Sequence, residues 1–106
     1  MKQITAGEFK KVVDAGAQDS AVDIIDVRTP EEYEEEHIPG VRNVPLAELE
    51  SRANEFAGKE KVYVHCQRGG RSSQAVEILD ALGTDTEFVN VEGGVNAWIE
   101  AGFETE

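Results

Sequence analysis

The chain has 106 residues, the length of a single domain with its own core, and its 22 Asp and Glu against 10 Lys and Arg give a formal net charge of −12. So acidic a chain repels phosphate backbones, which argues against nucleic acid as a partner. One cysteine excludes an internal disulfide, no apolar run is long enough to cross a bilayer, and no charged-then-apolar leader opens the sequence. We therefore expect one domain over residues 1–106, located in the reducing cytoplasm and without a membrane partner.

The first half of the chain alternates helix and strand signals. Thr5 is a candidate N-cap for a helix that ends near Gly16, and residues 22–27 form a short apolar run typical of a buried strand. Thr29 followed by Pro30 predicts the start of a second helix. Residues 41–44 then predict a brief strand. Pro45 is predicted to open a further helix, whose apolar residues recur at helical spacing, namely Leu46, Leu49, Ala53 and Phe56.

The second half continues the alternation. Residues 61–65 and 88–91 predict two further strands. A helix follows the first of them and ends at Gly83, and a last helix carrying Trp98 follows Gly93 and Gly94. We interpret Trp98 as a core residue. Strands separated by helices favour a parallel sheet covered on both faces, in which ligands bind beyond the carboxyl ends of the strands.

The single cysteine, Cys66, lies at such a strand end. It opens the loop Cys-Gln-Arg-Gly-Gly-Arg, which leads directly into a helix-patterned segment. Backbone N–H groups of a tight loop and the positive end of a helix dipole both stabilise an anion, and a thiolate is such an anion. This position therefore predicts a lowered pKa for Cys66 and a nucleophilic thiolate near neutral pH.

Two of the five arginines of the chain, Arg68 and Arg71, flank the glycines of this loop. In so acidic a chain they predict a small cationic site for a compact anionic substrate. Asp26 and Arg28 end a predicted strand, where we expect a partly buried ion pair that fixes neighbouring loops, with a direct substrate role for Arg28 as the alternative. Ser72, like Ser73 after it, is a candidate cap for the helix after the loop, although either hydroxyl is also placed to touch a bound oxyanion.

The two histidines are interpreted as structural. His65 precedes the nucleophile, and its side chain is expected on the opposite side of the strand, where it supports the loop rather than acting as a general base. His37 is expected to contact its own turn. One cysteine and two scattered histidines do not form a metal site, so we expect neither a metal nor another cofactor.

Taken in order, these residues resemble the single-domain rhodanese sulfurtransferases. The resemblance covers nearly the whole chain and rests on four groups of residues: Asp26, Val27 and Arg28 with Glu32 and Tyr33; residues 37–41 with 43–45; the loop 66–71 with Ser72 and Ser73; and Gly93, Gly94, Trp98 and Gly102. It implies an α/β fold, a three-layer α/β/α sandwich around a five-stranded parallel sheet. It also implies that Cys66 carries a persulfide during turnover.

By this resemblance, Cys66 takes a sulfane sulfur from a donor such as thiosulfate and passes it to a thiol, to cyanide or to a sulfur-accepting protein. Gln67, Arg68, Gly69, Gly70 and Arg71 are the expected substrate-binding residues, and Gln67 stands where the family often has a charged residue. Phosphatases and arsenate reductases of the same fold are the main alternative, but they have five residues between cysteine and arginine, whereas this loop has four. The second alternative is a non-catalytic sulfur-carrier or protein-binding module.

Overall fold

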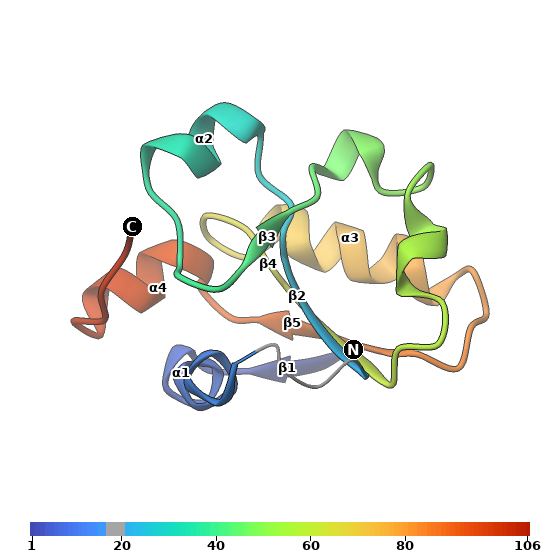
Figure 1. Cartoon of the computed structure of the whole chain (residues 1–106), viewed down its shortest axis with the longest axis horizontal. Helices are drawn as coiled ribbons and strands as arrows, with labels where there is room; N and C mark the ends of the chain where they lie inside the picture. Colours follow the sequence, from blue (N-terminus) through green and yellow to red (C-terminus); the bar gives the residue numbers. More distant parts are fainter. Residues whose placement is uncertain (17–20) are drawn as a thin grey trace.

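The computed structural model describes residues 1–16 and 21–106, and Figure 1 shows its arrangement. Its strands are β1 (Lys2–Ile4), β2 (Val22–Asp26), β3 (Arg42–Asn43), β4 (Lys61–His65) and β5 (Glu87–Val91). Its helices are α1 (Ala6–Ala15), α2 (Pro30–Glu35), α3 (Gly70–Asp80) and α4 (Gly94–Glu100), with 3₁₀ turns at Leu46–Glu48 and Ala53–Phe56. No helix in the described ranges is long and apolar enough to cross a membrane.

The strands form one parallel sheet in the order β1-β5-β4-β2-β3. This arrangement confirms the α/β fold with five parallel strands that the resemblance implied. The pattern of apolar residues located four of the strands but not β1, whose three residues pair in order with Val89, Asn90 and Val91 of β5. A three-residue edge strand with one half-buried apolar side chain, Ile4, has too short a pattern to stand out in the sequence.

Helices cover both faces of the sheet, and the alternation of side chains along β4 assigns each face to its own core (Figure 1). Val62 and Val64 pack with α3 and the two 3₁₀ turns, and Cys66 belongs to this cluster. Tyr63 packs on the other face in a cluster with Phe9 of α1 and residues of α4. The two cores meet at the sheet, so β4 and the loop that follows it are held from both sides.

The continuous helix predicted after Pro45 is wrong, since the structure has two short 3₁₀ turns instead. Leu49 and Phe56 are buried as the periodicity required, but short turns are sufficient to bury them. Ser51 and Asn54 lie between these positions, and such side chains compete for backbone hydrogen bonds and favour turns. The Ser51 hydroxyl indeed donates to the Glu48 carbonyl at 2.9 Å.

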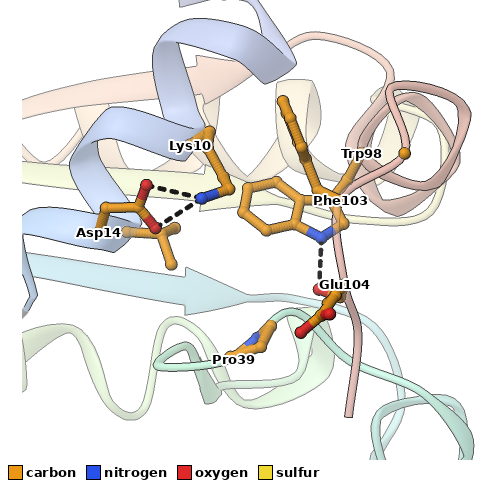
Figure 2. Close-up of a pocket in the computed structure, with 8 residues that line it drawn as sticks. Lys10, Asp14, Pro39, Trp98, Phe103 and Glu104 are labelled. Atoms are coloured by element: carbon orange, nitrogen blue, oxygen red, sulfur yellow. Dashed lines mark hydrogen bonds and ion pairs between the residues drawn. The ribbon is translucent and has the colours of Figure 1, made fainter.

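The segment after α4 packs against Trp98 of that helix, and Figure 2 shows Phe103 and Glu104 of this segment beside the indole ring. Trp98 is buried, as predicted, and its indole Nε1 donates to the Glu104 carbonyl at 2.8 Å. Phe103 meets the Trp98 ring edge-on at a centroid distance of 5.0 Å. The hollow beside them also contains the ion pair of Lys10 and Asp14, at 2.6 Å. The hollow lies away from Cys66, which is not among its lining residues.

Candidate active site

The sheet topology brings three separate segments to one place. Strands β2 and β4 are parallel neighbours with Asp26 opposite His65, so the segment after β2 runs beside the loop after β4. Helix α2 begins in the first of these segments, and α3 begins at the end of the Cys66 loop. The start of α4 reaches the same loop, because Val95 N donates to the Cys66 carbonyl at 2.9 Å. The candidate site therefore lies at the carboxyl ends of the central strands, where folds of this kind bind ligands.

The sulfur of Cys66 accepts hydrogen bonds inside this loop. Gly69 N donates to Sγ at 3.0 Å, and the Ser72 hydroxyl lies 3.5 Å from it. Burial raises the pKa of the Cys66 thiol, but hydrogen bonds from Ser72 and from loop amides outweigh burial, so the pKa is lowered below the ordinary thiol value. The direction agrees with the sequence prediction. The hydrogen bonds, rather than the arginines, are the leading causes of the lowering.

Ser72 is buried in the first turn of α3 and does not cap it. The prediction that a serine caps this helix is wrong because Gly69 occupies the N-cap position, where no side chain accepts from the helix. The Ser72 hydroxyl lies 3.1 Å from the Gly69 carbonyl and 2.5 Å from Oδ1 of Asn90, a buried residue of β5. Its one proton can turn to the sulfur when Cys66 is ionised. Ser72 therefore supports the thiolate, not the helix terminus.

Glycines allow the loop to turn tightly and allow the start of α4 to pack closely against it. Gly69 has φ +113°, a conformation that side chains rarely adopt, whereas Gly70 has open space where a Cβ would stand and no positive φ. Below the loop, a Cβ on Gly94 would lie 2.1 Å from the Cys66 carbonyl oxygen. The start of α4 thus contacts the outward-facing loop carbonyls, which leaves loop amides to face the sulfur.

A buried network holds the loop from the side of β2. The predicted ion pair of Asp26 and Arg28 is present at 2.8 Å, and Arg28 is only 3% exposed. Its guanidinium also donates to Gln67 Oε1 at 2.9 Å and to the Glu36 carbonyl at 2.7 Å. The Gln67 amide in turn donates to Asn96 Oδ1. Arg28 and Gln67 therefore join the loop to α2 and α4 through contacts within the protein.

Arg71 projects from α3 toward α2. Its guanidinium forms a two-pronged ion pair with Glu32, with Nη1 to Oε1 at 2.6 Å and Nη2 to Oε2 at 3.0 Å. Hydrogen bonding to Arg71 lowers the pKa of Glu32 to about 2, so this carboxylate is ionised at neutral pH. Arg68 is exposed and has no ion-pair partner in the described part of the chain. Arg71 is therefore paired with a carboxylate, whereas Arg68 is exposed to solvent.

His65 is fully buried on the face of β4 that packs against α1, with its ring 5.7 Å from that of Phe9. Burial lowers the pKa of His65, and its Nδ1 lies 3.3 Å from the Cys66 carbonyl. A neutral, buried ring on the side away from the sulfur supports the loop, as predicted. His37 stacks on Tyr33 and contacts its carbonyl, within its own turn. The described residues contain no His, Cys, Asp and Glu group suited to a metal.

A hollow of about 310 Å³ opens above the loop. Its lining residues are Cys66, Gln67, Arg68, Gly70 and Arg71. A nucleophilic sulfur at its base, amides around that sulfur and cations at its rim suit the transfer of a small group to and from Cys66.

The family model that matches this sequence is the rhodanese-like domain, over residues 5–101. The chain belongs to the rhodanese-like family. The match runs from the N-cap of α1 to the end of α4, so every element of the site described above lies within it.

Relatives of this rhodanese-like domain carry different names. A putative sulfur carrier protein of Bacillus subtilis, YrkF, is 40% identical over 96 residues, which is 91% of this chain but only 50% of that protein. The thiosulfate sulfurtransferase PspE of Escherichia coli is 46% identical over 61 residues, 56% of this chain and 59% of PspE. A solved structure from Rhodopseudomonas palustris, described as a possible tyrosine phosphatase, matches with a TM-score of 0.88 at 27% identity. The match covers 100% of this chain and 85% of the Rhodopseudomonas chain.

The structure of this rhodanese-like domain also identifies contributors that the sequence pattern did not single out. Glu32 enters the sequence analysis only through the resemblance, yet in the structure it lies in the first turn of α2 and pairs with Arg71. The sequence pattern does not single out Asn90 on β5 or Asn96 on α4, although a polar residue inside an apolar strand is a signal for Asn90. Each of these contacts joins residues at least 18 positions apart, which no local pattern reveals.

Proposed function

We propose that this domain, extending over residues 1–106, is a sulfurtransferase that moves a sulfane sulfur from a donor such as thiosulfate to a thiol, to cyanide or to a sulfur-accepting protein through a Cys66 persulfide. The observation that carries the proposal is the Cys66 sulfur, whose pKa is lowered and which accepts from Gly69 N at the base of an open hollow. The names of YrkF and PspE support the same kind of chemistry.

In the first step the Cys66 thiolate attacks the outer sulfur of thiosulfate. A bond forms between the two sulfurs, the donor S–S bond breaks, and its electron pair leaves with sulfite. Loop amides that now stabilise the thiolate would stabilise the negative charge of the persulfide. An acceptor such as cyanide then attacks the outer sulfur and leaves as thiocyanate, which restores the Cys66 thiolate. Neither step needs an oxidant or a metal.

The alternative is phosphatase or arsenate-reductase chemistry. The similar Rhodopseudomonas structure is described as a possible tyrosine phosphatase, which favours this alternative. A phosphatase requires a general acid for the leaving oxygen. Glu32 contacts the loop arginine, but with a pKa of about 2 it is ionised at neutral pH and cannot donate a proton. Four residues rather than five separate Cys66 from Arg71, so the loop encloses less space than that of a phosphatase. Sulfite and thiolates leave without protonation, so sulfur transfer fits better.

The persulfide itself tests the proposal. Intact-protein mass spectrometry after incubation with excess thiosulfate should show a gain of one sulfur atom, removed by cyanide or dithiothreitol. Cys66→Ser should show no gain, and a gain that persists in this variant would refute the assignment to Cys66. A non-catalytic binding module need not form the adduct at all, and a phosphatase would instead hydrolyse an aryl phosphate.

A further inference from the structure

The ion pair of Arg71 and Glu32 affects which sulfur donor the site accepts. Both terminal nitrogens of Arg71 already donate to the Glu32 carboxylate. Glu32 is held there by Thr29, whose backbone N and hydroxyl both donate to Oε1 at 3.1 Å in the capping box of α2. The carboxylate is therefore fixed against Arg71 by the start of its own helix.

This arrangement opposes a doubly negative donor in two ways. An oxyanion that binds Arg71 must compete with the Glu32 carboxylate, which already accepts from both terminal nitrogens. A dianion near Arg71 is also repelled by the negative charge of Glu32. The formal net charge of −12 adds a repulsive field. Arg68 is the loop cation that remains unpaired among the described residues, and it is exposed and solvated. The site is thus less cationic than the loop sequence suggests.

We propose that Glu32 is a specificity-determining residue that screens the charge of Arg71, so that the site favours an organic persulfide over dianionic thiosulfate. The inference rests on the sulfurtransferase function proposed above and names its donor class. An organic persulfide carries at most one negative charge on its sulfur pair, and the open hollow above the loop leaves space for its organic group.

The transfer balances without a further reactant. The Cys66 thiolate attacks the outer sulfur of R–S–SH and a Cys66 S–S bond forms. The donor S–S bond breaks with its electron pair on the inner sulfur, which leaves as the thiolate R–S⁻, and the proton stays on the transferred sulfur.

The chain offers a matched pair of variants. Glu32→Gln removes the charge opposite Arg71, while glutamine at this position keeps a capping box. Glu8→Gln removes the same charge from an equivalent capping box at the start of α1, where Glu8 contacts Thr5. Single-turnover loading of Cys66 is followed by intact mass spectrometry with two donors, thiosulfate and 2-hydroxyethyl hydropersulfide.

In Glu32→Gln we expect the second-order loading constant for thiosulfate to rise about three- to tenfold, with less than about a twofold change for the hydropersulfide. Glu8→Gln should change neither constant. Sulfate, a dianion that cannot donate sulfur, should inhibit loading by the hydropersulfide more strongly in Glu32→Gln than in the wild type. Glu32→Asp, which retains the charge on a shorter side chain, should give intermediate thiosulfate loading.

The proposal is overturned if Glu32→Gln leaves thiosulfate loading unchanged, if it changes both donors equally, or if Glu8→Gln has the same effect. Loading of the wild type by neither donor would instead refute the sulfurtransferase function, and the role of Glu32 with it. The two failures are thus distinguishable.

Discussion

At the residue scale, the acidity of Cys66 depends on a few short-range hydrogen bonds. The sequence placed two arginines beside the sulfur, but in the folded chain Arg71 is paired with Glu32. The lowered pKa of Cys66 instead depends chiefly on Ser72 and on loop amides, which act against burial. An arginine that is already paired with a carboxylate lowers the pKa of a nearby thiol less than a hydrogen bond made directly to the sulfur does.

This difference predicts how Cys66 reactivity responds to mutation. The alkylation rate of the wild type should rise with pH and inflect below the ordinary thiol value. Ser72→Ala should move the inflection upward and reduce the rate at pH 6 by at least about threefold, since hydrogen bonds to charged groups contribute about 1.5–3 kcal/mol. The rate of iodoacetamide alkylation, measured against pH, tests this.

Two controls sharpen the measurement. Ser73→Ala removes the neighbouring hydroxyl, which lies 3.4 Å from the amide of Asn90, and should leave the inflection unchanged. Arg71→Ala should move it upward by less than Ser72→Ala does. A larger effect for Arg71→Ala than for Ser72→Ala would show that charge, not hydrogen bonding, sets the acidity.

At the element scale, the loop is shaped by helices that begin beneath and beside it. Helix α3 starts within the loop, and α4 starts against its outer carbonyls. The close approach at Gly94 explains why this position has no side chain, because a Cβ would overlap the backbone of Cys66 and Gln67. The packing of α4 therefore helps to set the geometry of the candidate site, although no residue of α4 lines the hollow above the Cys66 loop.

Gly94→Ala should consequently slow the loading of Cys66 with sulfur by more than the loss of folding stability accounts for. The added Cβ forces the Cys66 carbonyl and α4 apart, and loss of amide placement of this kind costs about a hundredfold in rate. Gly83→Ala is the matched control, since Gly83 also has positive φ but open space around its Cβ position. It should cost about 1 kcal/mol of stability from backbone strain and leave loading unchanged.

Thermal melts and single-turnover loading from 2-hydroxyethyl hydropersulfide separate the two effects. Equal loading by Gly94→Ala and Gly83→Ala, each measured well below its melting temperature, would show that the contact with α4 does not position the loop.

At the scale of the whole molecule, the excess of acidic residues determines how stability depends on salt. A net charge of −12 on 106 residues makes the folded chain repel itself, although ion pairs such as Arg42 with Glu55, at 2.6 Å, offset part of the repulsion. Exposed ion pairs contribute little each, so the repulsion should be the larger effect at neutral pH.

Added salt should therefore raise the melting temperature at pH 7, because it screens charges about 10 Å or more apart at 0.1 M ionic strength. We expect a rise of several degrees between roughly 0.02 and 0.5 M NaCl. Near pH 4.5, the sequence pI, the net charge is small and the same salt should have little effect. Differential scanning calorimetry at both pH values tests this, and a fall in melting temperature with salt at pH 7 would mean that ion pairs outweigh repulsion.

The sequence by itself determined the alternation of elements, the parallel sheet and the position of Cys66 at a strand end, because these depend on periodicity, caps and turn residues close together in the chain. It did not locate β1 or the 3₁₀ turns after Pro45, because the conformation of such short segments is set by the elements that they pack against. Only the tertiary structure decided the environment of the thiolate. The partners of Arg71, Ser72 and Gln67 come from α2, β5 and α4, and strand order rather than local sequence brings those elements together.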